Sequence, residues 1–291
     1  MTGAWHNRRG MALVFVLYLL VTLGVIAAEV ARNGRQEAAK VAGLRARSVS
    51  RYAAESGIAL GMVRVHRILD SAAATPASQV AALRDVAADL EQVGDTMMGA
   101  ARFRVAVINL NARIDLNRAS KEMLEKFLAQ FAGPQQVNEA VAALRKEPLR
   151  RVGELARVPG LSPGLAFAIA PYITVWGDGL VDINAAPETV LVALRGLEPA
   201  AAQALVSRRE AGEIFTSSDP MRPRRGLSTE PETMEDARGS GPIPQAIPTP
   251  TRLLLVSQGW QEGHPLTHEI QAAYAILGHR LVLQAWSERD L

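Results

Sequence analysis

Five histidines are the side chains best suited to acid–base catalysis or to holding a transition metal, because the 291-residue chain contains no cysteine. They are His6, His66, His264, His268 and His279. His264 and His268 are four residues apart, but Pro265 and the turn setting argue against a helical metal-binding pair, and we interpret both as solvent-facing hairpin residues. His6 falls in the leader, His66 on the stem and His279 in a turn, and none of these three has a visible carboxylate partner. The sequence also lacks a Gly-x-Ser-x-Gly elbow, a phosphate loop and a dinucleotide fingerprint, so we predict that the protein is not an enzyme.

An acidic cluster is the second candidate for ligand binding, and it lies in a stretch rich in proline, serine and glycine at 217–250. Its carboxylates are Glu230, Glu232, Glu235 and Asp236. Calcium takes about six to eight oxygen ligands at defined positions, and no loop pattern here specifies them. We favour a solvated acidic loop, keep calcium as the weaker alternative, and predict no other cofactor.

Two glycine-containing turns raise the question of DNA binding. Gly160-Leu161-Ser162 and Gly196-Leu197-Glu198 each stand between helical runs, as in helix-hairpin-helix units. Neither turn has the second glycine of the DNA-binding form, and Glu198 places a carboxylate where an anion would lie. Residues 112–216 hold twelve Lys/Arg and twelve Asp/Glu, so no cationic surplus faces a phosphate. We expect no nucleic acid, and a DNA-binding or DNA-uptake membrane protein remains the alternative function.

The N-terminal segment carries the strongest signal in the chain. Gly10 separates the paired Arg8 and Arg9 from an uncharged apolar run at 11–28. That run approaches the ~20 residues needed to cross a bilayer as a helix. Because Lys and Arg are retained on the cytoplasmic side, the N-terminus is expected inside and the rest of the chain outside. A cleaved secretory signal, a twin-arginine signal and an unprocessed anchor are the alternatives.

Charge and composition agree with a membrane-proximal arm followed by a folded head. Residues 1–70 hold ten Lys/Arg and four Asp/Glu, whereas the rest of the chain is net acidic. Apolar residues make up 48% and charged residues 21%, which excludes wholesale disorder and a multi-span membrane protein. Basic residues along the arm are interpreted as a solvated helix face, with anionic lipid or acidic partner stems as the alternative. They are Arg32, Arg35, Lys40, Arg45 and Arg47.

Hydrophobic periodicity predicts the elements that surround these residues. A helical pattern continues from the apolar run to about Leu69 and is broken at Thr75-Pro76. Period-two alternation predicts strands at 102–110, 252–260, 267–277 and 280–286. Between the first and second strands the sequence repeats itself, since 114–119 (IDLNRA) is echoed by 181–186 (VDINAA). Each copy precedes a helix, which we expect to be capped by Ser120 in the first copy and by Asn184 or its neighbours in the second.

The leader, with Gly10 before an apolar helix, resembles that of type IV pilins and type II secretion pseudopilins. The resemblance implies cleavage between Gly10 and Met11 by a prepilin peptidase, followed by N-methylation of Met11. Most members of these families carry a glutamate five residues after the cleavage point, but here Phe15 stands at this stem-assembly position. Without that carboxylate the chain is poorly suited to follow another subunit in the repeating stack.

The order of motifs is similar to that of the minor pseudopilin K family of type II secretion. Leu116-Asn117 fits the motif after the family's first strand, and 183–187 (INAAP) fits its second motif. The resemblance implies the I and J subunits, and H as well, as partners. It also implies a single-pass protein of the bacterial inner membrane with a periplasmic head at the filament tip, where it takes part in assembly and secretion.

We therefore predict an α+β protein in which a long pilin-like N-terminal helix packs on an antiparallel sheet, with a large α-helical insertion of two helix-hairpin-helix (SAM-like) units. The expected parts are a leader at 1–10, a transmembrane segment at 11–28, a stem helix at 29–72, the first part of the head at 73–111, the insertion at 112–216, a mobile loop at 217–250 and C-terminal strands at 251–291.

Overall fold

The computed structural model describes residues 5–71, 75–86, 93–217 and 245–291. Residues 1–4 of the expected leader, and the acidic cluster Glu230, Glu232, Glu235 and Asp236, lie outside the described residues. Within these ranges, side chains are described from Met11 onwards, except at positions 12, 76 and 85.

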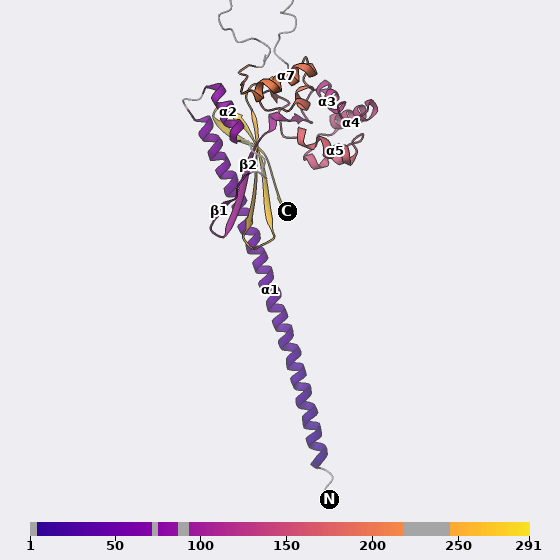
Figure 1. Cartoon of the computed structure of the whole chain (residues 1–291). Coiled ribbons are helices and arrows are strands. Elements are labelled where there is room, and N and C mark those ends of the chain that lie inside the picture. The colour runs from indigo at the N-terminus through magenta and orange to yellow at the C-terminus, as the bar shows by residue number, and fades with distance from the viewer. Residues whose placement is uncertain (1–4, 72–74, 87–92, 218–244) are drawn as a thin grey trace, which may run out of the picture.

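One long helix, α1 (Trp5–Leu69), dominates the shape of the molecule (Figure 1). Its N-terminal part projects away from the head, and its C-terminal part lies along the sheet. A short helix, α2 (Pro76–Val86), follows the break that Thr75-Pro76 predicted. The apolar spacing of the stem is explained by this packing, because Ala54, Ile58 and Val65 are buried against the sheet.

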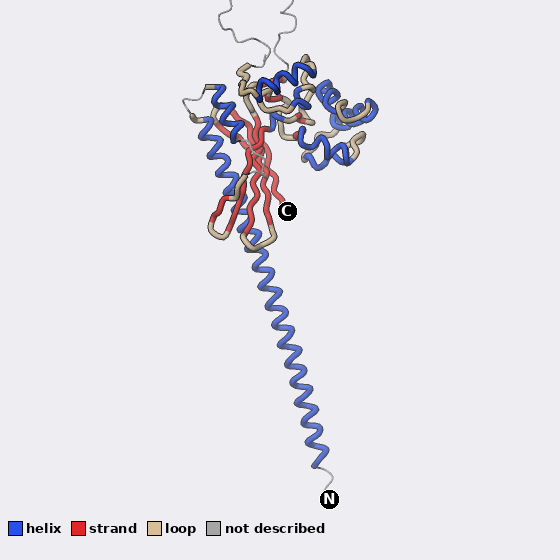
Figure 2. Tube along the Cα trace, in the orientation of Figure 1, coloured by secondary structure: helices blue, strands red, loops and turns tan. Residues whose placement is uncertain are grey.

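The head contains a five-stranded antiparallel sheet of order β1-β2-β7-β8-β9 (Figure 2). The strands are β1 (Thr96–Met98), β2 (Ala101–Asn109), β7 (Arg252–Gln261), β8 (Thr267–Leu277) and β9 (Arg280–Asp290). Helix α1 covers one face, on which Val107, Leu253 and Leu255 point toward it. The approach is close, since a Cβ on Gly259 of β7 would lie 2.3 Å from the backbone nitrogen of Ala54. The predicted long helix on an antiparallel sheet is confirmed.

The regular structure described between β2 and β7 is mostly helical and lies on the side of the sheet away from α1 (Figure 2). Its helices are η2 (Leu110–Ala112), α3 (Lys121–Leu128), α4 (Pro134–Lys146), η3 (Val152–Arg157), α5 (Pro163–Ile169), η4 (Ala170–Tyr172), α6 (Glu188–Leu191) and α7 (Pro199–Glu210). Two parallel strand pairs accompany them, β3 (Ile114–Asp115) with β4 (Ile173–Thr174) and β5 (Val181–Asp182) with β6 (Ala246–Ile247). The repeated sequence thus forms the first strand of each pair.

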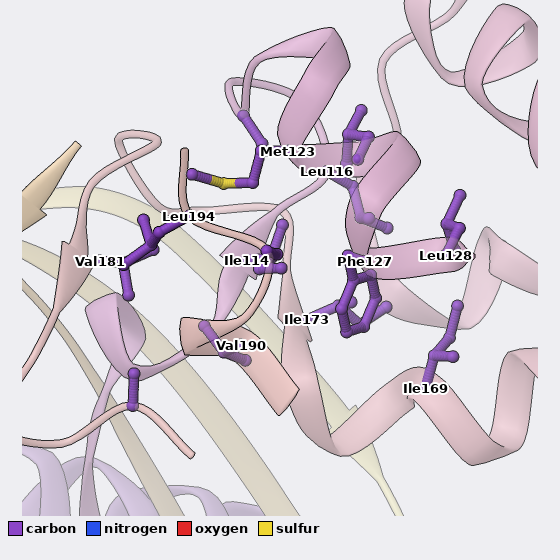
Figure 3. Packing of buried hydrophobic residues seen from close by; sticks show 14 of the residues in the cluster. Ile114, Leu116, Met123, Phe127, Leu128, Ile169, Ile173, Val181, Val190 and Leu194 are labelled. Atoms are coloured by element: carbon purple, nitrogen blue, oxygen red, sulfur yellow. The ribbon is translucent and has the colours of Figure 1, made fainter. Parts of the chain in front are cut away.

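The two repeated units share a single hydrophobic core. Side chains of the first unit, such as Ile114 and Phe127, belong to one buried cluster with Val181, Val190 and Leu194 of the second (Figure 3). Because neither unit has a core of its own in this cluster, the insertion is expected to unfold as one body.

The solvent-facing interpretation of His268 is wrong. The predicted strand at 280–286 extends to Asp290, and its register places Asp290 opposite His268. His268 is buried, with Nδ1 2.7 Å from Asp290 Oδ1 and Nε2 3.2 Å from Glu288 Oε2. The carboxylates were invisible as partners because they lie 20 and 22 residues further along the chain.

Candidate functional site

The projecting half of α1 is an exposed apolar surface. Every side chain described between Met11 and Ala42 is exposed, including Phe15 at 67% and Tyr18 at 71%. Contact with the head begins at Ala46, which is 1% exposed. Leaving such a surface in water costs about 25 cal/mol for each Å² of apolar area. The stem therefore needs lipid or other apolar helices around it.

Length and composition allow this helix to cross a membrane. Within the described residues, Leu13–Leu69 contains a window of mean hydropathy 2.5 with none of its residues buried. After Arg9 the next charged residue of α1 is Glu29, and the residues that follow it pair along the helix: Arg32 donates to Glu29 at 3.0 Å and Lys40 to Glu37 at 2.8 Å. The charged part of the stem thus starts where the apolar run ends.

The structure places Gly10, Met11 and Phe15 on the same continuous helix. Met11 and Phe15 are four residues apart, so they lie on one face, a single turn from each other. Gly10 is helical as well, whereas a peptidase needs an extended segment. Cleavage there would require the first turns of α1 to unwind, which is a small cost at an unpacked helix end.

Two of the basic stem residues are tied to the head. Arg47 donates from Nε to Asp290 Oδ2 at 2.9 Å, and Arg51 lies 3.4 Å from Glu288. These two carboxylates also contact His268, so α1, β8 and β9 meet in one ionic cluster. Arg47 is thereby assigned to an intramolecular contact rather than to lipid. The pKa of Asp290 is lowered by its hydrogen bonds from His268 and Arg47.

Asn117, from the first copy of the repeat, joins distant backbone segments. Its Nδ2 donates to the carbonyls of Leu149 at 2.9 Å and Val175 at 3.1 Å, while its Oδ1 accepts from the Leu149 nitrogen at 2.9 Å. A single amide therefore ties the chain after α4 to the chain after β4. Ser120 caps α3 as predicted, accepting from the Met123 nitrogen at 3.1 Å.

Asn184 makes the same three bonds in the second copy. Its Nδ2 donates to the carbonyls of Phe215 at 2.8 Å and Pro248 at 2.7 Å, and its Oδ1 accepts from the Phe215 nitrogen at 2.9 Å. The prediction that Asn184 caps a helix is wrong, because its amide is turned toward these segments and α6 begins after Pro187 without a side-chain cap. Each copy of the repeat thus supplies an asparagine whose side-chain amide joins two distant backbone segments, an arrangement that we call an amide clip.

A carboxylate two residues before each asparagine is buried as well. Asp182 Oδ1 accepts from the Asn184 nitrogen at 2.9 Å, and its Oδ2 accepts from Asn109 Nδ2 at 2.7 Å. Burial raises the pKa of Asp182 to about 6, although these hydrogen bonds and Arg209 oppose the shift. Burial also raises the pKa of Asp115, whose Oδ2 has no hydrogen-bond partner among the described residues.

The raised pKa of Asp182 predicts a pH-dependent stability. The ordinary pKa of 3.8 applies to the unfolded chain, so between pH 7 and pH 5 the folded state takes up a proton that the unfolded state does not. The free energy of unfolding should therefore rise by about 1 kcal/mol as the pH falls through this range. Urea unfolding of the full chain in neutral detergent at both pH values measures it. Asp182→Asn should lose this increment, and an equal rise in both proteins would contradict the assignment.

A second polar network fixes the insertion to the sheet. Asn111 is 1% exposed, and its Oδ1 accepts from the backbone nitrogens of Thr251 at 2.9 Å and Arg252 at 2.8 Å. Its Nδ2 donates to Asp178 Oδ1 at 2.9 Å and to the Leu180 carbonyl at 3.0 Å. The sequence analysis did not identify this junction. It joins three points of the chain: the end of β2, the link between the two repeated units and the start of β7. In the sequence, the only signal was an asparagine directly after the strand predicted at 102–110.

The two glycine turns lie in different environments. Gly160 has φ +82°, and a Cβ there would lie 2.5 Å from the Gln136 carbonyl oxygen and 2.9 Å from the Ala140 nitrogen. The turn thus packs on α4. Gly196 is open to solvent but stands beside the exposed Glu198.

The absence of a nucleic-acid partner remains a prediction, as does the calcium alternative. Within the residues that the structure describes, no group of three or more His, Cys, Asp or Glu side chains could hold a metal.

Comparison with known proteins gives a likeness in fold. No family model matches the sequence, and no curated protein matches it either. The fold matches a chain in the crystal structure of the GspK-GspI-GspJ complex from the type 2 secretion system of enterotoxigenic Escherichia coli. The match covers 88% of this chain and 99% of that chain, with a TM-score of 0.53 and 11% sequence identity. This chain therefore shares the fold of that chain over most of its length.

Proposed function

We propose that this protein is the K-type minor pseudopilin of a type II secretion system, acting at the tip of the pseudopilus in filament assembly, its initiation and protein secretion across the outer membrane. The observation that carries the proposal is the fold shared with a chain of a GspK-GspI-GspJ complex over 88% of this protein. An exposed apolar stem below that head supplies the physical means of assembly.

The stem exchanges one apolar environment for another. Before assembly its uncharged run at 11–28 lies in the inner membrane, with the N-terminus in the cytoplasm and the head in the periplasm. In the filament the same side chains pack against the stems of the I and J subunits, and of H. Because lipid tails and apolar helices solvate this surface similarly, transfer between them is close to neutral and can be driven by modest head contacts.

Two features support a place at the tip. Phe15 offers no carboxylate to the amine of a neighbouring subunit, and the stem carries no acidic residue between Met11 and Glu29. The helical insertion also overhangs the sheet at the end of the molecule away from the N-terminus (Figure 1). A subunit stacked above would have to accommodate this bulk, whereas the last subunit of the filament need not.

Processing of the leader is part of the proposal. A prepilin peptidase would cut between Gly10 and Met11, and the new amine of Met11 would be N-methylated. The proposed role is assembly, and it includes no catalytic activity of the head.

Replacing Gly10 with valine is expected to block this processing, because a β-branched residue neither fits a glycine site in a protease nor unwinds from a helix as readily. The mass of the protein extracted from membranes should show N-methylated Met11 for the natural chain and an intact Met1 for Gly10→Val, with secretion lost. Gly24→Val is the matched control, since nothing lies within 4 Å of Gly24 in the same helix.

A natural chain that retains Met1 would contradict the proposal. So would a chain that begins at Glu29, because that product indicates an ordinary signal peptide.

A further inference from the structure

A groove of about 540 Å³ lies between the sheet and the helical insertion. Its floor is the sheet face opposite α1, where Ile108, Leu254 and Val256 form an apolar strip. The insertion forms the other wall through Val152 and Trp176. The strip borders the junction described above, so the groove is framed by two rigidly joined parts of the fold.

The floor continues into a polar ladder that crosses four strands. Arg104 donates to Gln258 Oε1 at 2.9 Å, and Gln258 Nε2 donates to Glu269 Oε2 at 2.7 Å. Arg289 completes the ladder by donating from Nε to Glu269 Oε1 at 2.9 Å. Glu269 is 4% exposed and already accepts from these partners and from Gln271, so its charge is compensated inside the ladder.

Arg289 and Glu269, which pair with each other in the ladder, both line the groove. The other charged side chains that line it are Arg113 and Arg151, and both are cationic. Arg151 is exposed at the rim beside Val152, whereas its neighbour Arg150 is exposed but does not line the groove. An apolar floor below a cationic rim is complementary to a ligand that carries apolar and acidic groups in alternation.

We propose that this groove binds an extended, acidic and apolar peptide segment of a partner protein. Arginines suit carboxylates because their planar fork can make two parallel hydrogen bonds. A volume of about 540 Å³ fits a short extended segment better than a helix, whose diameter with side chains is about 10 Å. The sheet floor and the wall of the insertion favour the same extended geometry.

A membrane lipid does not meet these requirements. About 27 Å of helix separates Ala28, where the apolar run ends, from Ala46, where α1 is first buried against the head. A bilayer around the apolar run therefore stays far from the groove. The inference concerns the head and does not depend on how the stem assembles.

The test uses the full chain in neutral detergent with two fluorescein-labelled peptides of twelve residues, one alternating Leu with Glu and the other Leu with Lys. Anisotropy should rise with the Glu peptide and not with the Lys peptide. Arg151→Glu should weaken binding at least about tenfold, because it reverses a rim charge. Arg150→Glu is the matched control and should leave the affinity unchanged. Ser287→Trp, which fills the groove from β9, should abolish binding.

The proposal is wrong if the Glu peptide does not bind, if the two peptides bind equally, or if Arg150→Glu and Arg151→Glu lose the same affinity. Displacement of the bound Glu peptide by vesicles of phosphatidylglycerol would assign the groove to lipid instead and would also overturn it. None of these outcomes bears on the processing of Gly10, so the two proposals fail separately.

Discussion

Asn184→Ala is expected to lower the free energy of unfolding of the helical insertion by about 3 to 6 kcal/mol, because it leaves two carbonyls and one backbone N–H buried without a partner. The free energy of unfolding of an ordinary domain is only about 5 to 15 kcal/mol, so the variant should be partly unfolded at 37 °C. Because the two units share one hydrophobic core, the first unit should be destabilised as well. Urea unfolding followed by far-UV circular dichroism, with limited proteolysis of the insertion, measures the effect.

Asn138→Ala is the matched control. Asn138 is exposed on α4, so this substitution removes an amide of the same size without burying an unpaired group. Its effect should stay within about 0.5 kcal/mol and should be neutral or stabilising, since alanine favours the helix. Similar losses in the two variants would show that the clip at Asn184 contributes little.

Gly57→Leu should separate α1 from the sheet. A Cβ at Gly57 would lie 2.1 Å from Ser257 Oγ and 2.9 Å from a ring carbon of Phe103, and both side chains are buried. Overpacking of this kind costs about 1 to 3 kcal/mol or more, and here a whole helix must move. Leucine regains about 1 kcal/mol of helix propensity over glycine, so we expect a net loss of up to about 2 kcal/mol, and more if α1 is displaced.

The same change at Gly43 provides the control, because Gly43 lies on the same helix with nothing within 4 Å. Gly43→Leu should be stabilising by up to about 1 kcal/mol through helix propensity alone. The two free energies of unfolding, measured on the full chain in neutral detergent, should therefore change in opposite directions. A loss of equal size in both variants would mean that α1 is not held against the sheet at Gly57.

Local patterns allowed the elements of the fold to be predicted. Helical spacing up to Leu69 and alternation in 102–110 depend on neighbours within a few residues, and the structure has α1 and β2 at those places. The break at Thr75-Pro76 was predicted as well, but the helix α2 that begins there was not. The membrane segment at 11–28 could also be predicted, because crossing a bilayer requires a contiguous stretch of apolar residues. The repeat at 114–119 and 181–186 indicated two related units for the same reason.

Side-chain partners could be found only in three dimensions. The sequence marked Asn117 and Asn184 as equivalent, but their acceptors lie about 30 to 60 residues away, and no local rule selects them. His268 was misjudged because its carboxylates arrive on a neighbouring strand through the register of β8 and β9. The groove has the same origin, since β2, β7 and the insertion meet only after the chain has closed on itself. Periodicity and hydropathy are properties of contiguous residues, whereas clips, ion clusters and grooves depend on which distant segments pack together.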